Sequence, residues 1–292
     1  MLEKLFFLLL KSKSQNVIVR EMNIMRLSQA FFVLLAAKLL ISCEVFEVHP
    51  YDGKITGETN INAKNMARIE NTIKGKDTIR FALISDSQRW YDELEAFVQH
   101  VNKETKVDFI IHGGDISDFG LTKEFLWQRD ILAGLKQPYV AVIGNHDYLA
   151  NGDEVFSKVF GDLNFSFIAG HTKFLCLSTN ALESNYSEPI PDFSFLKKEQ
   201  QNNEGEYTNT VAIMHAQPTS EQFNNNVSDL FQYSIKKYPN LLFCAHGHGH
   251  NYMAVDVFQD GIIYYQTPNI GKRQYILFTI TNDSYKHELV TY

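Results

Sequence analysis

The chain lacks the features that mark several common protein classes. Its 292 residues include only three cysteines and no Cys-x-x-Cys pair, which argues against a zinc site built from thiolates. Its formal net charge is −7, so it has no general attraction for nucleic acid, and this disfavours a nuclease. It also lacks internal repeats and low-complexity tracts. The remaining composition, 45% hydrophobic, suits one α/β domain of about 200–250 residues with a sizeable core.

The N-terminal segment resembles an export signal. Arg26 gives it a basic start, an apolar run extends from Ala30 to Ile41, and the run is followed by Ser42-Cys43. The stretch Leu40–Cys43 is similar to the lipobox of bacterial lipoproteins, in which the cysteine is lipidated and becomes the first mature residue. An ordinary signal peptide and a transmembrane anchor are the alternatives, although the run is short for crossing a bilayer. We therefore expect lipidation at Cys43 and a lipoprotein anchored on the outer side of a bacterial membrane, in the cell envelope.

This interpretation divides the chain into three parts. Residues 1–43 form the signal segment, residues 44–78 form a tether with a short helix, and residues 79–292 form the domain that carries the chemistry. The short helix is expected over Asn60–Lys74, because its apolar residues share one face and Gly75 follows as a stop.

The first half of the main domain alternates between apolar strands and amphipathic helices. Strands are expected at Arg80–Ser85, Asp108–His112 and Val140–Gly144, with helices at Tyr91–Lys106 and Leu121–Leu135. This alternation is typical of a parallel sheet with right-handed crossovers.

The second half of the domain is richer in strands. We expect strands at Phe174–Ser178, Thr210–Met214 and Leu241–Ala245, a helix at Phe193–Gln201, and further strands from Tyr252 to Tyr292. The predicted fold is α/β: a two-sheet β-sandwich whose sheets pack face to face and are flanked by helices, in αββα layers.

Oxygen and imidazole donors stand where the expected strands end. They are Asp86, Asp115, Asn145, His215, His248 and His250. In open α/β sheets, ligands bind at the carboxyl ends of strands. Carboxylates, a carboxamide and imidazoles together suit Mn²⁺, Fe or Zn²⁺ rather than Ca²⁺ or Mg²⁺. Because there are more donors than one tetrahedral ion needs, we expect two divalent metal ions with one bridging carboxylate, the usual device for attack on a phosphoester.

Each of these residues taken alone has an ordinary explanation. An aspartate after a strand is usually a turn residue or a helix cap, and a single histidine is more often a satisfied polar group than a ligand. A His-x-His pair is more specific, because alternate residues of a strand face the same side. It is the complete set, in one order at successive strand ends, that favours a metal site.

The ordered residues resemble the motifs of the calcineurin-like metallophosphoesterases. That superfamily shows Asp-x-His, Gly-Asp-x-x-Asp, Gly-Asn-His-Asp/Glu, a lone His and Gly-His-x-His. This chain has, in the same order, Asp86-Ser87-Gln88, Gly114–Asp118, Gly144–Asp147, His215 and Gly247–His250. The departure is Gln88, where the family usually has histidine.

The resemblance implies how two metal ions would be bound. The carboxylate of Asp115 would bridge both ions. The first ion would also be bound by Asp86, Gln88 and His250, and the second by Asn145, His215 and His248. The carbonyl oxygen of Gln88 is a weaker donor than imidazole for Zn²⁺ or Fe, so the first site is expected to bind more loosely or to prefer Mn²⁺.

The resemblance also implies catalytic roles for two residues that are not ligands. His146 would lie beside the phosphate, stabilise the transition state and help to protonate the leaving group. Asp118 would orient that imidazole through a hydrogen bond. Asp147 is expected to cap the segment that follows it. His112 is expected in the core, and His246 in the core or at the edge of the pocket.

The expected function is hydrolysis of a small phosphomonoester or phosphodiester by a binuclear metal site. A nuclease of the same superfamily is one alternative. A catalytically inert metal-binding or cell-surface interaction module is another. Gln88 alone supports the inert module, whereas His146 and Asp118 oppose it, because a protein that only binds metal needs neither.

Overall fold

The computed structural model describes residues 53–103, 106–202, 205–282 and 284–292, together with Met25, Ser28, Gln29 and residues 31–35. The chain separates into two units, Met1–His49 and Pro50–Tyr292. In the first unit the described residues are helical, and no helix in the described parts of the chain is long and apolar enough to span a bilayer. Cys43 lies outside the described residues, so its lipidation stays a prediction.

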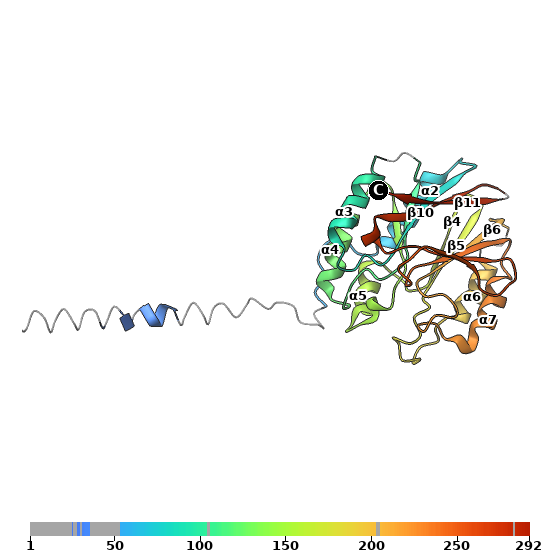
Figure 1. Ribbon diagram of the computed structural model, residues 1–292. Coiled ribbons are helices and arrows are strands. Elements are labelled where there is room, and N and C mark those ends of the chain that lie inside the picture. Colours follow the sequence, from blue (N-terminus) through green and yellow to red (C-terminus); the bar gives the residue numbers. More distant parts are fainter. Residues whose placement is uncertain are drawn as a thin grey trace, which may run out of the picture. The chain divides into compact units, whose positions relative to one another are not determined.

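Within the described part of Pro50–Tyr292, the first of two mixed sheets has five strands in the order β11-β10-β1-β2-β3 (Figure 1). These strands are β1 (Ile79–Ile84), β2 (Phe109–His112), β3 (Tyr139–Ala141), β10 (Gln274–Ile280) and β11 (Tyr285–Thr291). The pairs β1–β2 and β2–β3 are parallel, as the alternation of strands and helices predicts. The two C-terminal strands extend the sheet on the other side of β1 in antiparallel fashion.

The second sheet of the described residues has six strands in the order β4-β5-β6-β7-β9-β8. They are β4 (Phe165–Ala169), β5 (Thr172–Leu177), β6 (Asn209–Met214), β7 (Leu241–His246), β8 (Met253–Asp256) and β9 (Ile263–Gln266). The four central strands β5, β6, β7 and β9 are mutually parallel, while β4 and β8 are antiparallel edges. The carboxyl ends of β5, β6 and β7 therefore meet at one edge.

Aromatic side chains fill the space between the two sheets. Phe81 of β1 stacks on Phe278 of β10, with ring centroids 5.0 Å apart. Phe81 also meets Phe174 of β5 edge to face, with centroids 5.3 Å apart, and so links one sheet to the other. Phe243 of β7 stacks on Phe278 at 4.5 Å. Such contacts join the sheets face to face, as expected.

Helices cover the outer faces of both sheets (Figure 1). Helices α3 (Tyr91–Val101), α4 (Thr122–Leu132) and α5 (Gly152–Val159) share a core with the first sheet. Helices α6 (Phe193–Gln201) and α7 (Ser228–Ile235) share a core with the second. The predicted αββα layers are thus confirmed.

The helix expected near the start of the folded unit is α2 (Ile61–Ile73). Its Ile69 and Ile73 are buried among the residues between the two sheets. The side chain of Asn62 bonds both the carbonyl oxygen and the amide nitrogen of Ala141 in β3, at 2.9 Å each. Helix α2 is therefore tied to the edge strand of the first sheet.

Candidate metal centre

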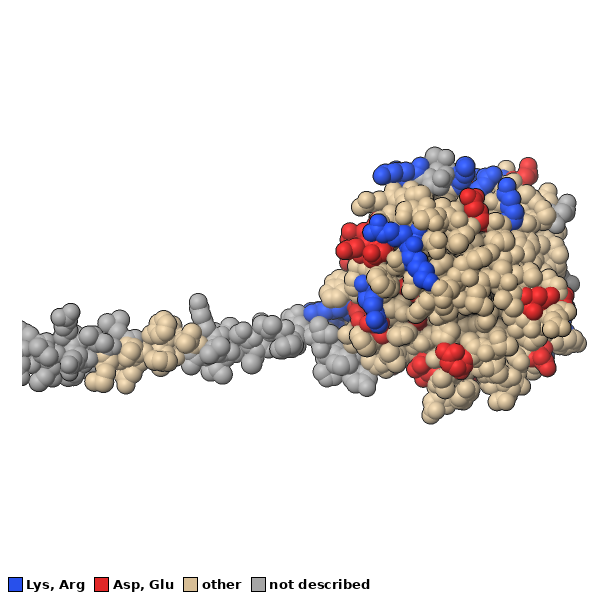
Figure 2. Space-filling model, viewed as in Figure 1, with Lys and Arg blue, Asp and Glu red and all other residues tan. Residues whose placement is uncertain are grey.

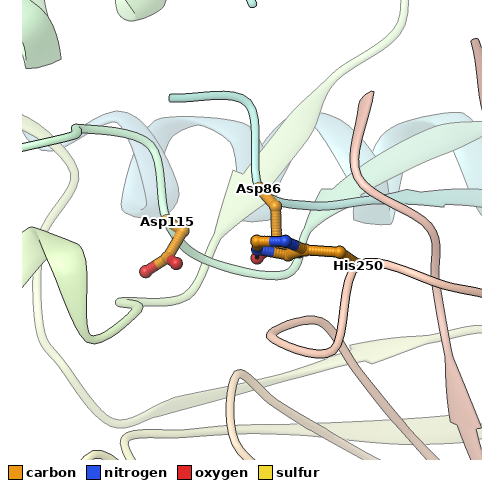
Figure 3. A group of neighbouring side chains, drawn as sticks. All are labelled: Asp86, Asp115 and His250. Carbon is orange, nitrogen blue, oxygen red and sulfur yellow. Dashed lines mark ion pairs between the residues drawn. The ribbon is translucent and has the colours of Figure 1, made fainter. Parts of the chain in front are cut away.

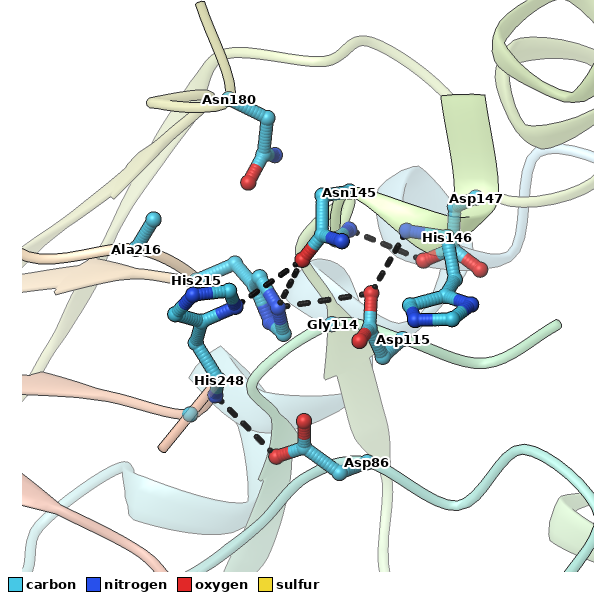
Figure 4. Close-up of polar contacts among 12 residues, drawn as sticks. Asp86, Gly114, Asp115, Asn145, His146, Asp147, Asn180, His215, Ala216 and His248 are labelled. Carbon is cyan, nitrogen blue, oxygen red and sulfur yellow. Dashed lines mark hydrogen bonds and ion pairs between the residues drawn. The ribbon is translucent and has the colours of Figure 1, made fainter. Parts of the chain in front are cut away.

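Loops that follow five strands bring the expected ligands to one place, and Figures 3 and 4 together label all of them except Gln88. Asp86 and Gln88 follow β1, Asp115 follows β2, Asn145 follows β3, His215 follows β6, and His248 and His250 follow β7. Because these strands belong to both sheets, the site lies across the open edge of the sandwich, and its geometry depends on the packing of the two sheets.

A first group of donors surrounds Asp86 (Figure 3). One ligand atom from each of Asp86, Asp115 and His250 lies within 4.8 Å of the others, an arrangement that could hold a metal ion. Nε2 of His250 is 3.2 Å from Oδ1 of Asp86. Among the described residues, neither this buried oxygen nor the buried Oε1 of Gln88 has a hydrogen-bond partner, while Nε2 of Gln88 donates to Oδ2 of Asp115 at 3.3 Å. Buried oxygens without donors are costly, and a cation would satisfy them.

A second group of donors surrounds Asn145 (Figure 4). Its Oδ1 lies 3.0 Å from Nε2 of His215 and 3.0 Å from Nδ1 of His248. Nε2 of His215 is also 3.3 Å from Oδ1 of Asp115. Nδ1 of His215 donates to the carbonyl oxygen of Gly113 at 2.8 Å, so in the neutral ring Nε2 carries the lone pair that faces these oxygens. Lone pairs that converge in this way need a positive charge between them.

The electrostatics of the centre agree with that requirement. Burial alone would lower the pKa of His215, but the neighbouring Asp115 carboxylate outweighs it and raises this pKa to about 9. Burial alone would raise the pKa of Asp115, but His215 holds it below the ordinary value. The side chains at the centre therefore attract a proton or a metal ion, and this set of carboxylates, amides and imidazoles fits a divalent metal.

His146 stands beside the ligands rather than among them. Its main-chain amide donates to Oδ1 of Asp115 at 2.9 Å, and its side chain is 35% exposed. Nδ1 donates to the main-chain carbonyl of Asp118 at 2.8 Å, whereas the Asp118 carboxylate is 3.7 Å away. The expected His–carboxylate hydrogen bond is therefore replaced by one to the main-chain carbonyl of Asp118. The carboxylate of Asp118 pairs with the exposed guanidinium of Arg89 instead.

Asp147 does not cap the segment that follows it. Its Oδ1 accepts hydrogen bonds from the amides of Ile116 and Ser117, at 2.9 and 2.7 Å, and from Oγ of Ser117 at 2.9 Å. Its Oδ2 accepts from the amide of Gly144 at 2.9 Å. The expectation of a cap is corrected: Asp147 reaches back and ties the loop after β3 to the loop after β2. Burial, with Asp115 nearby, raises the pKa of Asp147 to about 7.

The other two histidines near the site are buried. Burial lowers the pKa of both His112 and His246 to about 4. Nδ1 of His112 accepts from the amide of Gly114 at 3.2 Å, which leaves the Nε2 proton to be donated to Oγ of Ser87 at 2.8 Å. Neutral His112 therefore holds the loops after β1 and β2 together from inside the core.

Two further residues at the site were not singled out from the sequence. Arg89 directly follows Gln88. A basic residue next to a ligand motif is a local signal from which Arg89 could have been predicted at the site. Glu221, whose Oε1 lies 2.8 Å from Nε2 of His248, comes from the polar loop after β6, where nothing in the local pattern distinguishes it.

Comparison with known families identifies the class of the protein. The family model for the calcineurin-like phosphoesterases matches residues 79–252, which is more than half of the chain. The chain therefore belongs to the calcineurin-like phosphoesterase family, and the resemblance predicted from its motifs is confirmed. It is accordingly a hydrolase of phosphoester bonds with a candidate site for divalent metal.

Solved structures with the same fold are distant in sequence. A dimetal phosphatase from Danio rerio has 13% identity and a TM-score of 0.51, over 73% of this chain and 99% of that one. A purple acid phosphatase from yellow lupin (Lupinus luteus) seeds has 12% identity and a TM-score of 0.54, over 74% of this chain and 52% of that one. GAP50, the anchor in the inner membrane complex of Plasmodium, has 13% identity and a TM-score of 0.53, over 74% and 85%. These structural similarities show that the chain shares its fold with the three proteins. A search of curated protein sequences gave no match.

Proposed function

We propose that the chain hydrolyses a small phosphomonoester or phosphodiester at a site that binds two divalent metal ions. The observation that carries this proposal is the presence of two adjacent groups of lone-pair donors that share Asp115. Asp86, Gln88 and His250 would hold one ion together with Asp115, and Asn145, His215 and His248 would hold the other. When bound, such a pair of ions polarises a phosphoryl group and activates water.

The chain's own residues supply proton transfer and orientation. The Nδ1–H of His146 is fixed on the carbonyl of Asp118, so Nε2 on the opposite side of the ring is the atom that can carry a proton to a leaving group. The Asp118 carboxylate, 3.7 Å from Nδ1 of His146, is itself paired with the guanidinium of Arg89.

The proposed ions are Mn²⁺, Fe or Zn²⁺. Both proposed sites contain imidazole nitrogen as well as oxygen, a mixture that suits these metals better than Ca²⁺ or Mg²⁺. The first site has Gln88 in place of a histidine, so we propose that it is the weaker of the two for Zn²⁺ and Fe.

The substrate is proposed to be a small molecule rather than nucleic acid. On the face in view in Figure 2, the described Lys and Arg side chains lie over the upper and left parts of the domain with acidic ones among them, and the lower right part shows only acidic ones. With a formal net charge of −7, this surface provides little of the electrostatic attraction on which nucleic acid binding depends. We further propose that a lipid on Cys43 anchors the domain to the outer side of a bacterial membrane.

Removal and return of metal tests the proposal. The full chain, stripped with a chelator, is assayed on p-nitrophenyl phosphate and bis-p-nitrophenyl phosphate before and after addition of Mn²⁺ or Zn²⁺. We expect stripping to abolish hydrolysis and one of these ions to restore it, and the preferred ester separates a monoesterase from a diesterase.

Matched variants sharpen this test. Asp115→Asn removes the shared carboxylate and should not regain activity with either ion, whereas Asp229→Asn, an equal change of charge on the exposed face of α7, should behave as wild type. Full activity in metal-free protein contradicts the proposal. No activity on either ester with both metal sites filled favours the inert module instead.

A further inference from the structure

Glu221 makes a contact with one of the expected ligands that the family motifs do not describe. Its Oε1 lies 2.8 Å from Nε2 of His248, and the glutamate side chain is 69% exposed while that of His248 is 19% exposed. The pair thus lies at the rim of the centre, with the carboxylate on the solvent side and the imidazole on the metal side.

The loop that carries Glu221 is held on both sides of this residue. The next residue, Gln222, donates from Nε2 to Glu183 at 3.1 Å, and its carbonyl accepts from the amide of Leu182 at 3.2 Å. Phe223 is buried in the core beside α7. Before Glu221, the amide of Thr219 donates to Oδ1 of Asn225 at 2.7 Å. The carboxylate therefore reaches His248 from a fixed backbone, although its own atoms are exposed.

The contact determines which ring nitrogen of His248 carries hydrogen. An ionised carboxylate can only accept hydrogen bonds, so Nε2 of His248 must be the protonated nitrogen. Nδ1 then carries the lone pair, and it faces Oδ1 of Asn145 at 3.0 Å. The main chain of His248 is fixed as well, because its amide donates to Oδ2 of Asp86 at 3.2 Å.

We infer that Glu221 is a positioning residue for the second metal site, an inference that rests on the proposed function. Its carboxylate selects the His248 tautomer whose Nδ1 can bind metal, and it fixes the plane of the ring. A carboxylate behind a metal-binding histidine is a recurring arrangement, and its loss costs about 10–100-fold in metal affinity or activity.

The two histidines of the second site are oriented in different ways. His215 is fully buried, and a main-chain carbonyl, that of Gly113, holds its Nδ1–H. His248 lies at the rim and depends on the Glu221 side chain, which can be replaced without changing the backbone. Substitution of Glu221 therefore measures how much its contact with His248 contributes to metal binding.

Calorimetric titration of the chelator-stripped full chain with Zn²⁺ tests the inference. Wild type should show two binding events. Glu221→Ala should weaken one of them by about 10–100-fold and leave the other unchanged. Glu221→Gln, which can still accept the hydrogen bond but has no charge, should lie between wild type and Glu221→Ala. Asp229→Asn, the matched loss of an exposed carboxylate on α7, should titrate as wild type.

Nitrogen NMR of the histidine rings gives a second measurement that does not depend on activity. The His248 signals are assigned by comparison with a His248→Asn sample. In metal-free wild type, the His248 ring should hold its proton on Nε2. In Glu221→Ala, the same ring should be a mixture of tautomers. Two Zn²⁺ sites of wild-type affinity in Glu221→Ala overturn the role of Glu221 while the proposed function stands. Fewer than two Zn²⁺ sites in wild type overturn the proposed function itself.

Discussion

Gly144 offers a quantitative test of how closely the loops of the metal centre are packed. An ideal Cβ at this position would lie 2.1 Å from the main-chain nitrogen of Asp115 and 2.2 Å from its Oδ1. Both distances are below the 3.0 Å limit that real Cβ atoms respect, and the nitrogen belongs to the backbone rather than to a flexible side-chain end. Gly144→Ala must therefore push the loop after β3 away from the loop after β2.

The expected cost follows from what that movement disturbs. Overpacking of a close-packed region costs about 1–3 kcal/mol. Two hydrogen bonds of 2.9 Å are at stake. The amide of His146 donates to Oδ1 of Asp115 in the other loop, and the amide of Gly144 donates to Oδ2 of Asp147 within the loop after β3. With about 0.5–1.5 kcal/mol for each weakened bond, we expect the free energy of unfolding to fall by about 2–6 kcal/mol.

Urea unfolding of the metal-free protein, followed by circular dichroism, measures this loss. The midpoint for Gly144→Ala should fall with little change in slope, because the surface exposed on unfolding stays the same. Gly53→Ala is the control: the nearest atoms to its Cβ lie 3.9 and 4.0 Å away, so its free energy of unfolding should stay within about 0.5 kcal/mol of wild type. Gly144→Ala with a wild-type midpoint and wild-type affinity for metal would show that the two loops are not packed as described.

Three further predictions concern single residues. His146→Ala should lower kcat on p-nitrophenyl esters by about 10²–10⁴-fold while metal content stays at two ions, and loss of metal would show that His146 is a ligand. Gln88→His should tighten Zn²⁺ binding at the first site in calorimetry, because imidazole is the stronger donor; identical isotherms would place Gln88 outside the first coordination shell. In a bacterium that processes lipoproteins, wild type should fractionate with membranes and incorporate labelled lipid, and Cys43→Ala should do neither; a soluble, unlabelled wild-type protein would refute the anchor.

The first half of the fold could be predicted because its signals are local. Strands β1 and β2 are apolar runs buried on both faces, and helix α3 buries Leu94, Phe97, Val98 and Val101 at helical spacing. The end of each strand is marked by an abrupt change from apolar to polar residues. For that reason the sequence alone points to the candidate ligands, although only the complete set in its order favours a metal site.

Long-range features of the fold could not be predicted in this way. Strand β10 lies antiparallel to β1, with Phe81 opposite Phe278, and nothing near either residue specifies this pairing. The same holds for Asp147, whose position after His146 suggests a cap, whereas its partners lie in the loop after β2. The support that Glu221 gives to His248 also joins two loops that are distant in sequence.

The backbone at the ligands shows how strongly these long-range contacts act. Four expected ligands have left-handed φ values: Asp86 at 55°, Asp115 at 57°, His248 at 68° and His250 at 60°. Such conformations cost non-glycine residues of order 1–3 kcal/mol each and persist only where the surroundings impose them. Here the amide of Asp86 bonds the carbonyl of Gly114 at 3.0 Å, and the amide of His248 bonds Oδ2 of Asp86 at 3.2 Å. Contacts between loops that follow different strands therefore impose these left-handed conformations. The conformations in turn direct the four side chains toward the centre. Local preference alone would therefore not place these four residues in such conformations.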